Sequence, residues 1–282
     1  MSPAYLLAAL GSLFYGAGDF FGGISARRGP AASVALLSGF AALAILMVGV
    51  PMTPGVIRPH DLAWAAVAGL FSGVGVMLIY RALAIGPVSV ASPVLCIVGL
   101  MLPVIVGIAL GERPSALAIA GLALAPLAIV LLAQVGGGFP DDERIRVRRV
   151  LWPAIAAGLC AGCFLTCFGR IQPGAGLWPL ALGRAVGMAV LTIAILARRD
   201  PLLPPRAAWS PAFAAGALDS LANVAYVAGV QRGSLALVAA IVSLAPATTV
   251  VLARAVLNER MSRPQQVGFA LALASGALIS LG

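Results

Sequence analysis

The 282-residue sequence has no lysine, one histidine and few charged residues of any kind. Charged residues make up 10% of the chain and hydrophobic residues 61%. A soluble domain carries about 25% charged residues, because it must cover its core with polar surface. This composition therefore excludes a soluble globular domain, and it also excludes a disordered chain, a collagen and a disulfide scaffold. The sequence predicts an integral membrane protein.

The absence of lysine excludes several chemistries. A P-loop ATPase needs a lysine beside its phosphates, and Schiff-base or pyridoxal catalysis needs a lysine amine. We therefore expect no such cofactor. The net charge of +9 would indicate a nucleic-acid ligand in a soluble protein. Here the arginines are scattered between apolar segments, so we expect them to set membrane topology and to meet anionic lipid, with no nucleic-acid partner.

Apolar segments of about 20 residues, the length that crosses a bilayer, recur along the whole chain. They predict an all-α membrane protein with ten transmembrane helices, at 4–24, 31–51, 62–85, 88–110, 115–135, 150–170, 177–197, 207–230, 234–257 and 264–281. We divide the chain into a first five-helix repeat (1–135), a linker (136–149) and a second five-helix repeat (150–282). The first segment carries Asp19 and lacks a basic start, so we do not expect a signal peptide.

The distribution of arginine predicts the topology. Eleven arginines lie in the connections after odd-numbered segments and four in those after even-numbered segments. The positive-inside rule then places the odd connections in the cytoplasm and both termini outside.

An internal repeat relates the two halves at a constant offset of 147 residues. Leu110-x-Glu112-Arg113-x-Ser115 recurs as Leu257-x-Glu259-Arg260-x-Ser262, and several glycines match at the same offset. Each half contains five segments, an odd number, so the halves cross the membrane in opposite orientations. Such inverted repeats are typical of transporters that work by alternating access.

These motifs resemble one family. The elements that carry the resemblance are Gly111-Glu112-Arg113-Pro114-Ser115, Asn258-Glu259-Arg260-Met261-Ser262, Ala82-x4-Pro87-x-Ser89-x2-Ser92-Pro93, Ser243-x2-Pro246 and Phe14-Tyr15-Gly16-Ala17-Gly18-Asp19-Phe20. Over essentially the whole chain the sequence is similar to EamA-type transporters of the drug/metabolite transporter superfamily. The resemblance implies a bacterial inner-membrane exporter of amino acids, drugs or other metabolites. It also implies cytoplasmic termini, against the arginine count, and the sequence leaves that point open.

Polar residues inside the segments are the candidates for a substrate site. Ser12, Tyr15 and Asp19 share one helical face, and Asp219, Asn223 and Tyr226 share another. A carboxylate in hydrocarbon is costly, so each aspartate should face water, a partner or the bundle interior. The functional interpretation is a polar lining for a zwitterionic or cationic substrate, and the structural one is a buried network between helices. With Tyr80, these residues form the predicted substrate-binding set.

Three further charges receive structural interpretations. Arg184 has three possible roles: pairing with Asp219, holding a substrate carboxylate or extending to the membrane interface; we favour a structural one. Glu112 and Glu259 precede the fifth and tenth segments, where a carboxylate caps the positive end of a helix. Cys160, Cys163 and Cys167 fall along one helical stripe and are expected to pack, so that no metal site is predicted.

We expect a secondary active transporter that exports a small metabolite such as an amino acid or drug by alternating access. Proton coupling through Asp219 or Asp19 is a subsidiary hypothesis. The alternatives are a membrane-embedded enzyme acting on a lipid or prenyl substrate, and a channel. Such an enzyme would cluster acids or histidines at one interface, and here the acidic cluster Asp141-Asp142-Glu143 stands in a linker beside four arginines. The oligomeric state does not follow from the sequence.

Overall fold

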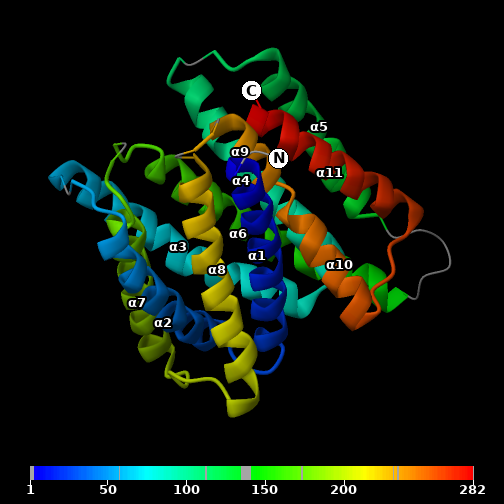
Figure 1. Ribbon diagram of the computed structural model, residues 1–282. Coiled ribbons are helices and arrows are strands. Elements are labelled where there is room, and N and C mark those ends of the chain that lie inside the picture. The colour runs from blue at the N-terminus through cyan, green and yellow to red at the C-terminus, as the bar shows by residue number, and fades with distance from the viewer. Residues whose placement is uncertain are drawn as a thin grey trace.

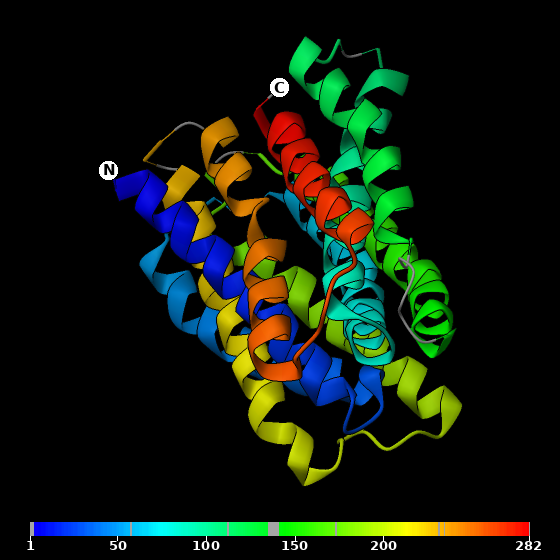
Figure 2. The same cartoon turned by 90° about the vertical axis from the view of Figure 1, so that its right-hand side faces the viewer.

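The computed structural model describes residues 3–56, 58–111, 113–134, 141–172, 174–230, 232–233 and 235–281. These residues form helices joined by short connections, and no strand occurs among them. Both ends of the chain lie at the same end of the bundle (Figures 1 and 2). The α-helices are α1 (Pro3–Ala26), α2 (Ala31–Gly49), α3 (Pro59–Ile85), α4 (Val88–Ala109), α5 (Ala116–Leu132), α6 (Asp141–Phe168), α7 (Trp178–Arg198), α8 (Trp209–Val230), α9 (Leu235–Val242), α10 (Ala245–Leu257) and α11 (Arg263–Leu281); two 3-10 turns are η1 (Val50–Met52) and η2 (Arg206–Ala208).

The helices have the length and surface of membrane spans. Within the described residues, nine helical segments of at least 18 residues are apolar enough to cross a membrane, and α5 is a shorter tenth of 17 residues. At 1.5 Å per residue α5 rises about 26 Å, close to the ~30 Å of a hydrocarbon core. Large apolar side chains point outward, among them Val48 and Ile193 with exposed fractions of 71% and 67%. The protein is therefore an all-α, multi-pass membrane protein.

The ninth predicted segment is a membrane span, as predicted, but a turn interrupts it. It is divided into α9 and α10 by a turn at Ser243 and Leu244. Pro246 stands in the first turn of α10. Proline lacks the amide hydrogen that would bond the carbonyl four residues earlier, and its ring clashes with that carbonyl. The Ser243 hydroxyl donates instead to the Ala240 carbonyl oxygen at 2.7 Å, which closes the end of α9.

The sixth helix begins earlier than predicted. It starts at Asp141 rather than at residue 150, so part of the predicted linker is helical and continuous with the membrane span. Val147 and Val150 on this extension are fully buried, whereas Arg148 and Arg149 are exposed. This amphipathic pattern lets the extension pack on its apolar side while its arginines stay at the surface.

The two halves of the chain pack in the same way. Contacts between α1 and α8 have their counterpart in those between α6 and α3, and the α2–α8 contacts correspond to those of α7 with α3. The α1–α8 pair is antiparallel and runs through the centre of the bundle in Figure 1. Replacing each helix by its equivalent in the other repeat, α1 by α6 and α8 by α3, therefore maps one pair onto the other. This is the relationship expected of two inverted five-helix repeats.

Matched glycines make matched contacts. Gly121 of α5 faces Ser275 and Ile279 of α11, and Gly268 of α11 faces Ala128 and Leu132 of α5. Every residue in the first contact lies 147 positions from its equivalent in the second. Small residues at these crossings let the helix backbones approach closely, which is how membrane helices associate without a hydrophobic driving force.

The bundle has two faces, which we name by their contents. The arginine-rich face is where α1, α3, α5, α7 and α10 end, and the terminal face is where α1 begins and where α2, α4, α6, α8 and α11 end. The two largest groups of buried side chains lie in the arginine-rich half, around Leu83, Val88 and Val150 and around Val34 and Tyr80. The protein is thus tightly packed toward its arginine-rich face.

Glu259 caps a helix, but not the one that it precedes in sequence. Its two carboxylate oxygens accept hydrogen bonds from the amides of Val88 and Ser89, both at 3.0 Å, at the start of α4. Arg27 lies 3.7 Å from the same carboxylate. The residue therefore joins the second repeat to the first at the arginine-rich face. Glu112, for which the same role was predicted, lies outside the described residues.

Candidate functional site

A cavity of about 140 Å³ lies between helices of both repeats. A cavity of this size in another protein holds one aromatic ring. Its walls lie near the middle of the helices, with Leu46, Phe164 and Leu180 nearer the terminal face and Val76 and Ile79 nearer the arginine-rich face. The lining residues are Tyr15 of α1, Leu46 of α2, Phe71, Ser72, Gly75, Val76 and Ile79 of α3, Ala161 and Phe164 of α6, Leu180 and Arg184 of α7, and Asp219 and Asn223 of α8.

One wall of the cavity is ionic. Arg184 of α7 donates through Nη2 to Oδ2 of Asp219 of α8, so the two residues form an ion pair within the bundle. The two side chains keep exposed fractions of 15% and 28%, and both line the cavity. The guanidinium has five N–H donors, and this contact uses a donor on Nη2 alone. The pair therefore retains hydrogen-bonding capacity toward the cavity.

Close helix packing sets the position of this pair. Gly183 and Gly187, on either side of Arg184, lie against Gly69 and Gly73 of α3. A helix turns 100° per residue, so glycines on the face toward α3 leave Arg184 free to point to another side, toward α8. Beside it, Asn223 donates from its side-chain nitrogen to the backbone oxygen of Asp219 at 2.7 Å, one turn along the same helix.

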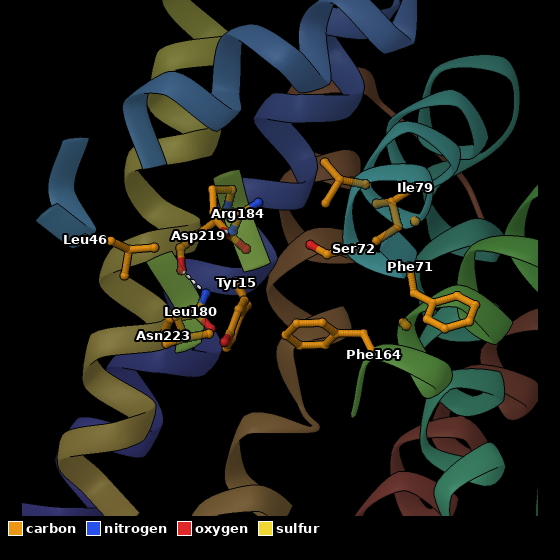
Figure 3. A pocket seen from close by; sticks show the side chains of 13 residues that line it. Tyr15, Leu46, Phe71, Ser72, Ile79, Phe164, Leu180, Arg184, Asp219 and Asn223 are labelled. Atoms are coloured by element: carbon orange, nitrogen blue, oxygen red, sulfur yellow. Dashed lines mark hydrogen bonds and ion pairs between the residues drawn. The ribbon is translucent and has the colours of Figure 1, made fainter. Parts of the chain in front are cut away.

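The opposite wall is apolar and aromatic. Phe71 of α3 and Phe164 of α6 form it, together with the aliphatic Val76 and Ile79. Figure 3 shows Arg184, Asp219, Asn223 and Tyr15 gathered on one side of the space and Phe71 and Phe164 on the other. The cavity is therefore amphipathic, and it suits a small molecule with a charged end and an apolar end.

The structure brings together part of the predicted substrate-binding set. Tyr15, Asp219 and Asn223 line the cavity, as does Arg184, for which we had favoured a structural role. Ser12, Asp19, Tyr80 and Tyr226 do not line it.

Tyr80 belongs to α3 but does not line the cavity. It is 4% exposed, and its hydroxyl donates to the Ser38 hydroxyl oxygen of α2 at 3.3 Å. Tyr80 follows the lining residue Val76 by four positions, so helical spacing alone would leave it on the same face. Its contacts with Gly22 of α1 and Ser38 of α2 direct its side chain away from the cavity.

Sequence reasoning missed the residues of the apolar wall and Ser72. Phe71 and Phe164 resemble any other apolar residue of a membrane span, because their role depends on which face of the helix meets the cavity. Ser72 had a signal that could have been used. It stands 147 residues before Asp219, so the repeat itself aligns the two positions.

The described residues contain no group of three or more histidine, cysteine, aspartate or glutamate side chains placed to hold a metal ion. The four cysteines are present as free thiols. Cys167 of α6 is buried, and Cys160 and Cys163 of the same helix and Cys96 of α4 are partly buried. The site is therefore described by its ion pair, amide, phenol and aromatic rings.

Comparison with known proteins agrees with this architecture. A search of curated protein sequences found none that matches. Among solved structures, one crystal structure has a TM-score of 0.64 with this chain at 20% sequence identity, with 99% of each chain covered, and shows that the fold occurs elsewhere. The model of the EamA-like transporter family matches twice, at residues 2–134 and 149–281. The chain therefore belongs to the EamA-like transporter family.

Proposed function

We propose that this protein is a secondary active transporter that exports a small zwitterionic metabolite with an apolar side chain, of which apolar amino acids are the simplest example. The observation that supports this most directly is the Arg184–Asp219 pair on one wall of an amphipathic cavity between the two repeats. A related cationic or zwitterionic drug would use the same chemistry.

The ion pair offers one partner for each charge of a zwitterion. A substrate carboxylate would take up the unused donors of Arg184, because a guanidinium binds a carboxylate through two parallel hydrogen bonds. A substrate ammonium would approach the carboxylate of Asp219 and the side-chain oxygen of Asn223. The apolar part would then lie against Phe71 and Phe164. The small volume favours a molecule of about the size of an amino acid over a large drug.

The inverted repeats supply a physical basis for alternating access. Two halves of similar structure and opposite orientation can exchange conformations, which opens a central site first to one face and then to the other. In this structure the arginine-rich half is tightly packed around Tyr80 and Leu83, and the cavity lies near the middle of the bundle. The conformation is consistent with a state that is closed toward the arginine-rich face.

The charge distribution supports an orientation in the membrane, and the direction of transport then depends on the driving gradient. We place the arginine-rich face in the cytoplasm, because arginine in short connections is retained on that side. The protein would then reside in the bacterial inner membrane and carry its substrate outward. Export against a gradient needs a driving force, and exchange for an inward-moving proton supplies one.

Reconstitution into liposomes tests this proposal. Vesicles containing the protein are loaded with radiolabelled leucine or phenylalanine, and efflux is followed with and without a pH gradient. We expect efflux that saturates and that excess unlabelled substrate inhibits, and we expect Asp219→Asn and Arg184→Met proteins to lose it. Two results together would overturn the proposal. One is efflux of apolar amino acids no faster than from loaded vesicles that lack the protein. The other is unchanged resistance of cells that overexpress the protein to toxic amino-acid analogues and cationic drugs.

A further inference from the structure

Among the described residues, two carboxylates, Asp19 and Asp219, lie near the middle of membrane-spanning helices, and their surroundings differ. Asp219 of α8 is paired with Arg184. Asp19 of α1 is partly buried, and in the described part of the chain it has neither an ion-pair partner nor a hydrogen-bond donor within reach. A carboxylate at membrane depth is costly and is expected to have a functional reason. Asp219 lines the cavity, which supplies a functional reason for its charge, whereas Asp19 does not line the cavity.

The groups around Asp19 do not supply a positive charge. It follows Tyr15 by one helical turn toward the arginine-rich face, and the other ionisable groups near enough to interact with its charge are Tyr80 of α3, Cys96 of α4 and Asp219 of α8. The phenols and the thiol are neutral at neutral pH, and Asp219 adds a negative charge that its pairing with Arg184 partly offsets. At this level α10 packs against α1 with Thr248 and Thr249.

Protonation has opposite consequences at the two acids. Arginine keeps its charge throughout the physiological range, so adding a proton to Asp219 would leave Arg184 as an uncompensated cation inside the bundle. Adding a proton to Asp19 removes a negative charge that has no counter-ion and that is repelled by Asp219. Asp19 is therefore the acid that can change its charge state without breaking an existing interaction.

Asp19 also stands at the boundary between the cavity and the packed half. One turn further along α1, Gly22 lies directly against the ring of Tyr80, whose hydroxyl donates to Ser38. This contact closes α1 against α3 on the arginine-rich side of Asp19. Asp19 does not itself line the cavity in this structure, but it lies one helical turn from Tyr15, which does. Opening of the Gly22–Tyr80 contact would give it access to the arginine-rich face, as ion exchange across the membrane requires.

We propose that Asp19 is the proton-carrying residue of the transport cycle and that Asp219 is the fixed charge that binds substrate. This inference rests on the proposed function as a proton-coupled exporter. A carboxylate oxygen of Asp19 takes a proton from water in the cavity while the terminal face is accessible. The same proton returns to water at the arginine-rich face after the conformational exchange, and the carboxylate is regenerated.

The first experiment needs no substrate. Infrared difference spectra of the purified protein between alkaline and acidic buffer report the carbonyl stretch of protonated carboxylic acids. We expect a band that is lost in Asp19→Asn, is shifted but kept in Asp19→Glu, and is kept in Asp219→Asn. Equal spectra for the wild type and Asp19→Asn would overturn the assignment. Size-exclusion profiles and thermal unfolding establish that each variant is folded, and Asp19→Glu keeps the test decisive if the asparagine variant is not.

The second experiment separates coupling from transport. In vesicles, exchange of one proton per substrate supports about a tenfold accumulation for a gradient of about one pH unit. We expect Asp19→Asn to accumulate no radiolabelled leucine above equilibrium while it still exchanges internal for external leucine. Accumulation that persists in Asp19→Asn, or that follows a sodium gradient instead, contradicts the inference. If the wild type moves no leucine at all, the proposed substrate fails, while the infrared result still decides the role of Asp19.

Discussion

Ser72 and Asp219 occupy equivalent positions in the two repeats, 147 residues apart, and both line the same cavity. The shared scaffold thus brings corresponding points of α3 and α8 to one site. The side chains have diverged, since one is a neutral hydroxyl and the other an acid. Arg184 shows the same divergence, because its equivalent in the first repeat is Leu37. The repeat explains where the cavity is, and the differences between the repeats explain why one wall is ionic.

The Arg184–Asp219 pair should behave as one unit in stability measurements. Removal of one partner of a buried pair costs about 3–5 kcal/mol, and the partial exposure of these side chains reduces the expectation to about 1–3 kcal/mol. We expect Arg184→Met and Asp219→Asn each to lower the thermal unfolding temperature in detergent. The double variant should recover most of that loss, because neither charge remains unpaired.

Transport provides the second readout for this pair. All three variants should fail to transport, although the double variant is stable. Additive destabilisation in the double variant would show that the two residues do not interact in solution.

The contact between Gly22 and Tyr80 predicts a sharp difference between two glycines of α1. A methyl group at Gly22 would overlap the Tyr80 ring, whereas one at Gly11 would meet its nearest neighbour, the Ala222 carbonyl oxygen, at 3.5 Å. Overpacking costs about 1–3 kcal/mol, so Gly22→Ala should be destabilised. Gly11→Ala should be neutral or slightly stabilised, because alanine favours the helix. Thermal unfolding of both variants checks this, and equal stability of the two would contradict the packing.

Residue pattern predicted the fold more completely than the site. Segment length and the 147-residue repeat were sufficient for the helices and for their arrangement as two repeats, because both depend on properties that persist over many residues. The break at Ser243 was missed although Pro246 marks it, since proline is tolerated in membrane helices and does not by itself show which helix is interrupted. Phe164 and the partner of Glu259 could not be predicted, because each depends on a contact between distant segments.

The arginine count makes a prediction about orientation that labelling can check. In a variant without native cysteines, a cysteine replaces the exposed Arg206 at the arginine-rich face or the exposed Arg170 at the terminal face. In intact bacterial cells a membrane-impermeant maleimide should label Arg170→Cys but not Arg206→Cys, because positive connections remain in the cytoplasm. Arg206→Cys should react once the cells are opened. The reverse pattern would place both termini in the cytoplasm and exchange the membrane sides assigned to the two faces.

Glu259 should contribute to both stability and closure of the arginine-rich face. Its carboxylate accepts two amide hydrogen bonds from the start of α4, and loss of a helix cap costs about 0.5–2 kcal/mol. Glu259→Ala should therefore unfold at a lower temperature, and Glu259→Gln should show a smaller effect, because an amide oxygen can replace one of the two bonds.

The same contact joins the two repeats, so its loss should loosen the closure of the arginine-rich face. In the Glu259→Ala protein, a cysteine introduced at Ser72 in the cavity should therefore react faster with a maleimide added at the arginine-rich face. Arg260→Gln is the matched control, because Arg260 is adjacent and exposed. An equal effect of Arg260→Gln on both measurements would show that general surface charge, and not the cap on α4, accounts for the result.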